Sequence, residues 1–188
     1  FLLNKGGLYK VYNGNLLYHG CVPLKEDGNL KSVRIFGHTY KGKGLYEVLE
    51  SYVRKGFYAM DSKEKERGKD IMWYIWLSEN SPLFGKDKMA TFERYFLAEK
   101  ETHKEKKNPY YLLLEDEKVI CHILKEFGLE NKDAHIINGH VPVKCKDGEK
   151  PIKCGGKVLV IDGGFSRAYQ KETGIAGYTL IYNSYGLI

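Results

Sequence analysis

Two histidines stand beside glycines at the ends of short apolar segments, an arrangement that could hold a metal ion. Residues 16–18 run into His19, and residues 136–137 lead through an Asn-Gly pair into His140. Neutral imidazole is a good ligand for borderline divalent metals. Two imidazoles do not complete a site, so carboxylates or an amide would have to join them. The same pattern also occurs in ordinary turns and beside structural histidines, and the residues alone leave both interpretations open.

Short strands are expected toward both ends of the sequence, where they would position these histidines. Asn13-Gly14 between two apolar segments is the strongest short hairpin signal. After residue 134, the segment around His135 predicts a strand, and Asp147-Gly148 predicts a second hairpin. The continuous apolar run at 157–162 is typical of a strand covered on both faces.

The middle of the chain has the periodicity of helices. One apolar stripe recurs at helical spacing, and it consists of Leu45, Val48, Leu49, Tyr52 and Val53. Gly56 is placed to end that helix. Residues 69–77 are apolar on all sides, which predicts a buried helix. The alternative for this aromatic segment is a subunit interface.

Composition excludes several classes of protein. The chain has 188 residues and a formal charge of +6, but its lysines are scattered, so we expect no nucleic-acid partner. No apolar run approaches the roughly 20 residues of a membrane span, so we expect no membrane partner. The four cysteines form no C-x-x-C pair, so we expect no zinc knuckle. A Cys145–Cys154 disulfide across a hairpin is the alternative to reduced thiols in a cytoplasmic protein, which we prefer. The apolar residues at both ends suggest a fragment of a longer protein.

Four longer segments carry more information than the histidines: "NLLYHGCVPL", "SPLFGKDKMATFERYF", "NGHVPVK" and "VLVIDGGFSRAYQKETGIAGYTLIYNSYGL". They resemble one family, the class III or Firmicutes-type fructose-1,6-bisphosphatases. The resemblance covers nearly the whole chain and is more specific than any two-histidine motif. It also implies the metallophosphoesterase superfamily, whose last two sequence blocks are similar to the segments around His19 and His140. The first three blocks, D-x-H, G-D-x-x-D-R and G-N-H-E, do not occur in these residues.

The resemblance implies an α/β (α+β) fold, a metallophosphoesterase-type β-sandwich flanked by helices and incomplete here. Residues 1–188 would be the C-terminal part of one such domain, with a helical insertion at 44–130 between the two metal-ligand blocks. His19 and His140 would be metal ligands. The cofactor would be Mn²⁺ in a dinuclear site completed by residues upstream, so this chain alone should be inactive.

The implied function is hydrolysis of the 1-phosphate of fructose 1,6-bisphosphate, giving fructose 6-phosphate and phosphate in gluconeogenesis. The alternatives are a metallophosphatase acting on a phosphoprotein or a dinucleoside polyphosphate, and a non-catalytic module of the parent protein. The second phosphate of a sugar bisphosphate needs cationic donors. The candidates are Arg167, Lys144, Lys171 and Lys86, with Arg167 preferred. The protein could also form a homo-oligomer.

Overall fold

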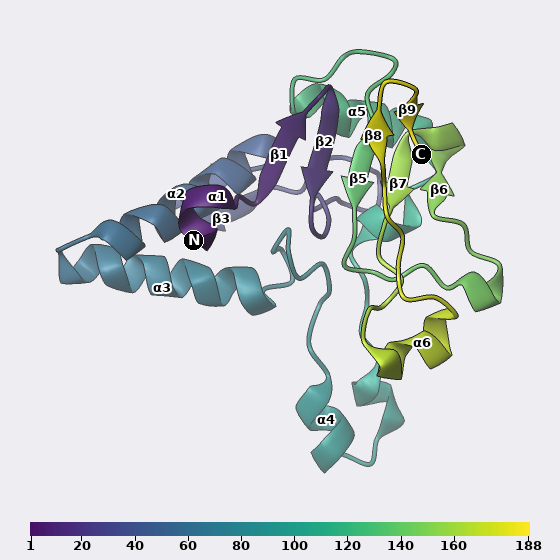
Figure 1. Ribbon diagram of the computed structural model, residues 1–188. Helices are drawn as coiled ribbons and strands as arrows, with labels where there is room; N and C mark the ends of the chain where they lie inside the picture. The colour runs from purple at the N-terminus through teal and green to yellow at the C-terminus, as the bar shows by residue number, and fades with distance from the viewer. The chain divides into compact units, whose positions relative to one another are not determined.

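The computed structural model describes all of residues 1–188, with short strands toward both ends of the sequence and helices between them (Figure 1). This mixed composition confirms the predicted α/β class at the coarse level. The helices are α1 (Leu2–Lys5), α2 (Gly42–Tyr58), α3 (Ser62–Leu77), α4 (Thr91–Phe96), α5 (Glu117–Glu126) and α6 (Arg167–Thr173), with 3₁₀ turns η1 (Lys100–His103), η2 (Pro109–Leu112), η3 (Cys145–Asp147) and η4 (Cys154–Gly156). The strands are β1 (Tyr9–Tyr12), β2 (Asn15–Tyr18), β3 (Val33–Ile35), β4 (His38–Tyr40), β5 (Ile136–Asn138), β6 (Ile152–Lys153), β7 (Val158–Val160), β8 (Tyr182–Asn183) and β9 (Gly186–Leu187).

The chain divides into two compact units. One comprises Phe1–Lys10 and Cys21–Leu113, and the other comprises Val11–Gly20 and Leu114–Ile188. The expectation of a single domain with an insertion at 44–130 stays a prediction. No helix is both long and apolar enough to cross a membrane.

The main sheet has five strands in the order β1-β2-β5-β7-β6 (Figure 1). Strand β5 pairs in parallel with β2 on one side and with β7 on the other, so the carboxyl ends of all three lie at one edge. The hairpin predicted at Asn13-Gly14 is confirmed as the β1–β2 turn, with left-handed φ angles of 48° and 73°. Leu16, Ile136 and Val158 are fully buried at the centre of the sheet, which fixes its register.

The hairpin predicted around Asp147-Gly148 is wrong. Residues 141–144 form no strand, and Gly148 instead ends the 3₁₀ turn η3 in a left-handed conformation. The antiparallel partner of β7 is β6, which reaches it through the turn η4. The Val143 N–H donates to the Asp162 carbonyl at 2.8 Å, so this segment follows the end of β7 and does not pair with β6.

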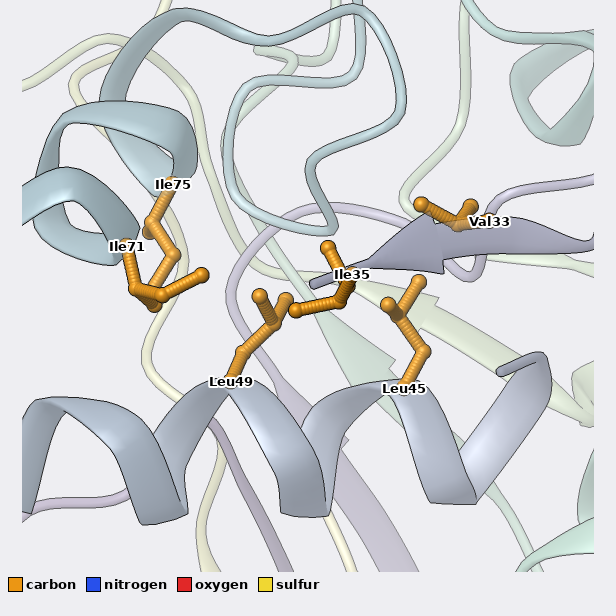
Figure 2. Close-up of a cluster of buried hydrophobic side chains, with 6 residues drawn as sticks. All are labelled: Val33, Ile35, Leu45, Leu49, Ile71 and Ile75. Atoms are coloured by element: carbon orange, nitrogen blue, oxygen red, sulfur yellow. The ribbon is translucent and has the colours of Figure 1, made fainter. Parts of the chain in front are cut away.

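The other unit has its core between the β3–β4 hairpin and the helix pair α2–α3. Figure 2 shows Leu45 and Leu49 on one face of α2, pointing toward Ile35 of β3. Ile71 and Ile75 of α3 complete the cluster one turn apart. The predicted apolar stripe on α2 is therefore confirmed as a core face.

Gly56 does not end α2, which continues to Tyr58. It lies instead at the contact of α2 with α3, which run side by side in Figure 1. A Cβ added at Gly56 would lie 2.5 Å from the Cα of Gly68 in α3. The glycine is therefore used for close approach of two backbones and not for a helix cap.

The prediction that residues 69–77 form a helix buried on all sides is wrong. Within α3 the buried residues are Gly68, Ile71 and Ile75, which share one face. The side chains of Trp73 and Trp76 are both 67% exposed. A helix that packs on α2 along a single stripe leaves these two tryptophans outside the core of its unit, whereas Tyr74 packs against it.

The Glu105 carboxylate joins several parts of the segment from Lys86 to Glu105. Glu105 accepts hydrogen bonds from the Lys86 ammonium at 2.8 Å and the Ala90 N–H at 3.0 Å, and Arg94 lies 3.7 Å away. Burial acts to raise the pKa of Glu105, but these hydrogen bonds and positive charges outweigh it and lower the pKa. The ionised form is thus favoured by the folded state.

Glu105→Gln should lower the free energy of unfolding at pH 7 by about 1–2 kcal/mol, because charge-assisted hydrogen bonds are lost. A depressed pKa in the folded state contributes stability above the unfolded pKa of about 4.3, and this is lost as the pH falls through the folded value. The difference between wild type and variant should therefore shrink between pH 5 and pH 3. Urea titrations across this range measure it, with Glu26→Gln, in the exposed pair with Lys106, as the control. Equal losses in both variants would contradict the assignment.

Candidate functional site

Three side chains with metal-binding or acid–base chemistry follow the three parallel strands at one edge of the sheet. His19 follows β2, His140 lies two residues beyond β5, and Asp162 lies two residues beyond β7. Backbone hydrogen bonds continue between neighbouring segments past the strand ends. The Gly139 N–H donates to the His19 carbonyl at 3.0 Å, and the Ile161 N–H donates to the Asn138 carbonyl at 2.9 Å. Ligands of open α/β sheets bind at such carboxyl edges.

The two histidines face each other with their ring nitrogens. His19 Nε2 lies 2.9 Å from His140 Nδ1, and the rings meet edge to face with centroids 4.8 Å apart. His140 has a φ of 67°, in the left-handed region that residues other than glycine rarely adopt. Such backbone strain persists where the surrounding structure enforces it, and it is concentrated at functional sites.

The facing nitrogens fit a shared divalent ion. Two nitrogens at about 2.1 Å from one ion and about 90° apart, as in octahedral coordination, would lie about 3.0 Å from each other. This is close to the observed 2.9 Å, which is also the length of a hydrogen bond between the two rings. Burial lowers the pKa of His19, and the nearby Asp162 charge raises it in part. The neutral imidazole that a metal requires is therefore favoured by burial.

The pair is not a complete metal site. No group of three or more His, Cys, Asp or Glu side chains in residues 1–188 is placed to hold an ion. Asp162 is close enough to influence His19, but its Oδ1 accepts the Gly164 N–H at 2.8 Å.

Sequence reasoning missed two polar residues at this edge, Asn138 and Asp162. Asp162 ends the apolar run of β7 just as His19 ends that of β2, so the shared pattern of strand followed by polar residue could have identified it. Asn138 is buried as the last residue of β5, and its amide donates to the Gly20 carbonyl at 3.1 Å. An asparagine inside an apolar run was the available signal.

The four predicted phosphate-binding cations lie in different surroundings. Arg167 is not in a loop but is the exposed first residue of α6, and Lys171 lies on the same helix. Lys144 is exposed, and its N–H donates to Glu149 at 2.9 Å. Lys86 is in the other unit, where its ammonium is paired with Glu105. Their binding roles stay predictions.

His135, which directly precedes β5, is hydrogen-bonded to Asn15 of β2. Its N–H donates to the Asn15 Oδ1 at 3.2 Å, and its Nδ1 lies 2.9 Å from the same atom.

All four cysteines are free, and Cys145 Sγ lies 2.7 Å from the Tyr178 hydroxyl. Its hydrogen bond to Cys145, together with burial, raises the pKa of Tyr178 to about 12. Because no cysteine is in a disulfide, the structure agrees with the expectation of reduced thiols.

The fold is that of an α/β protein with two histidines facing each other at the carboxyl edge of its main sheet. Comparison with known proteins names the family: the chain belongs to the Firmicute fructose-1,6-bisphosphatase family, whose model matches residues 1–188.

Individual relatives agree with the family match. The chain is 60% identical over 189 residues to the class 3 fructose-1,6-bisphosphatase of Clostridium botulinum strain Hall, and 59% identical over 188 residues to that of Clostridium acetobutylicum. It is 62% identical over 185 residues, or 98% of the chain, to that of Clostridioides difficile strain 630. The first two matches cover the whole chain, which spans 28% of the length of each of the three relatives. No solved structure matches the chain.

Proposed function

We propose that the full-length protein hydrolyses the 1-phosphate of fructose 1,6-bisphosphate, releasing fructose 6-phosphate and phosphate as a step of gluconeogenesis. Identity of about 60% to proteins named class 3 fructose-1,6-bisphosphatase, along the entire chain, supports this substrate. This identity favours a sugar bisphosphate as the substrate over a phosphoprotein or a dinucleoside polyphosphate, and it favours an enzyme over a non-catalytic module. The observation that carries the chemistry is the 2.9 Å approach of the His19 and His140 nitrogens at the strand ends.

His19 and His140 are proposed as ligands of Mn²⁺ in a metallophosphoesterase-type dinuclear site. Bound manganese would supply Lewis-acid stabilisation of phosphate charge and an activated water. The facing ring nitrogens of the two histidines, His19 Nε2 and His140 Nδ1, would be the ligand atoms once neither carries a proton, and the remaining polypeptide would supply the other ligands. A metallophosphoesterase β-sandwich, of which the five-stranded sheet would be a part, belongs to the same proposal.

The direct test is phosphate release by the full-length protein with and without Mn²⁺. We expect manganese-dependent hydrolysis of fructose 1,6-bisphosphate, little activity on fructose 6-phosphate or p-nitrophenyl phosphate, and none from the 188-residue chain alone. Activity on the aryl ester with none on the sugar would assign the site to another substrate. Manganese-dependent turnover by the 188-residue chain would contradict the incomplete site.

Arg167 is proposed to contact the second phosphate, together with Lys171 and Lys144. Arg167 and Lys171 lie on α6, which follows the end of β7. Arginine binds phosphate oxygens through charge-assisted hydrogen bonds.

Arg167→Ala should raise KM for fructose 1,6-bisphosphate about tenfold with little change in kcat, because it removes binding that ground state and transition state share. The effect on a sugar monophosphate should be small. Steady-state kinetics on both substrates measure the difference, with Arg34→Ala, on an exposed position of β3, as the control. Equal changes for both substrates would remove Arg167 from the second-phosphate site.

The cellular context follows the same proposal. We place the enzyme in the cytoplasm, which the four free cysteines support. A homo-oligomer remains the proposed assembly, and the exposed Trp73 and Trp76 on α3 are compatible with an interface there.

A further inference from the structure

Asn138 connects the two strand ends that carry the histidines. It is 2% exposed and lies two residues before His140 on the chain. Its Nδ2 donates to the carbonyl of Gly20, the residue directly after His19, at 3.1 Å. The Asn138 side chain thus joins the end of β5, which leads to His140, to the residue that follows His19.

This link adds to a backbone contact at the same place. The Gly139 N–H donates to the His19 carbonyl at 3.0 Å. The carbonyls of His19 and Gly20 are therefore both held from the β5 side, one by the Gly139 N–H and one by the Asn138 amide. Two such bonds to successive peptides fix the orientation of the chain at His19, and a single bond would leave it free to pivot.

The stability of the fold does not explain an amide at this position. Asn138 Oδ1 is buried and has no hydrogen-bond partner. Buried polar atoms without partners are unfavourable and rare in folded proteins. An aliphatic residue of similar size would avoid this cost, as the buried Ile136 and Ile137 do on the same strand. What the asparagine contributes here, and an aliphatic residue would not, is the hydrogen bond from its N–H₂ group to the Gly20 carbonyl.

We propose that Asn138 is the positioning residue of the two-histidine site, holding His19 and His140 so that their ring nitrogens converge on one ion. This inference rests on the proposed metal-dependent function. Residues that orient metal ligands without touching the metal typically change metal affinity 10–100-fold when they are replaced.

The test is Mn²⁺ binding by the full-length Asn138→Leu protein, measured by electron paramagnetic resonance of the free ion. We expect binding at least about tenfold weaker than in wild type. The melting temperature of the metal-free protein should change little, because the unpaired Oδ1 disappears as the Gly20 carbonyl loses its donor. Asn138→Ala, which also removes the donor to Gly20 and does so without a bulky side chain, is the second variant and should likewise weaken binding.

Asn15 provides a matched control. It is also a buried asparagine that bonds across β2 and β5, but through His135 at the opposite end of the strands. Asn15→Leu should lower the melting temperature and leave Mn²⁺ affinity within about twofold. Unchanged affinity in both Asn138 variants, or an equal loss in Asn15→Leu, would overturn the positioning role. His140→Ala, run in parallel, separates this outcome from failure of the metal site, because it should abolish tight binding whether or not Asn138 contributes.

Discussion

His140→Ala in the full-length protein should lower kcat/KM for fructose 1,6-bisphosphate by about a thousandfold. Losing one imidazole removes a proposed metal ligand, and an ion that stabilises phosphate charge contributes several kcal/mol to the transition state. A loss of about 4 kcal/mol corresponds to this factor in rate. Steady-state phosphate release at saturating Mn²⁺ measures it.

The same substitution should leave the metal-free fold almost unchanged. His140 is half-buried and lies beyond the end of β5, and its ring contacts that of His19. The melting temperature without metal should therefore stay within a few degrees of wild type. His122→Ala, on an exposed position of α5, is the control and should retain activity. A metal-free His140→Ala protein that unfolds would make this histidine structural.

Gly56→Ala should destabilise the α2–α3 pair by about 1–3 kcal/mol. The new Cβ would lie 2.5 Å from the Cα of Gly68, a backbone atom that cannot move aside without separating the helices. Higher helix propensity of alanine offsets about 1 kcal/mol of the clash at most. Hydrogen exchange of residues 42–77 in the full-length protein reports the local opening free energy.

Gly44→Ala, in the same helix, is the matched control with the opposite sign. A Cβ there meets no atom within 4 Å. Alanine should therefore stabilise α2 by about 0.4–1 kcal/mol through the entropy of the unfolded chain. Loss of stability in both variants would mean that the close approach at Gly56 does not limit the packing.

The strands and the histidine pair could be predicted because their signals are local. Asn13-Gly14 defines a turn by itself, and the apolar runs before His19 and His140 define strands. The 3.6-residue period of α2 likewise predicted the face that carries Leu45 and Leu49. Parallel strands then bring their carboxyl ends together by geometry, so two similar sequence patterns became one site.

The errors arose where a residue's role depends on its partner in space. Gly56 looks like a helix end until Gly68 is seen opposite it. The apolar run at 69–77 does not reveal that α3 packs along one stripe and leaves Trp73 exposed. The chain does turn at Gly148, as its sequence predicts, but the strand expected before this turn is absent.

At the site, the limit was similar. Asp162 could have been found from the pattern of strand followed by polar residue that identified the histidines. The role of Asn138 could not, because it depends on which carbonyl its amide reaches. The placement of Arg167 at the start of α6 depends on the path of the chain after β7, which composition does not determine.

The most direct test is whether His19 and His140 both coordinate manganese. Pulsed electron paramagnetic resonance of Mn²⁺ in the full-length protein, with histidine labelled with ¹⁵N, detects imidazole nitrogens coordinated to the metal. We expect the nitrogen coupling to decrease in His19→Ala and again in the double variant with His140→Ala. Couplings that stay unchanged in both variants would show that the facing nitrogens, 2.9 Å apart, are not metal ligands.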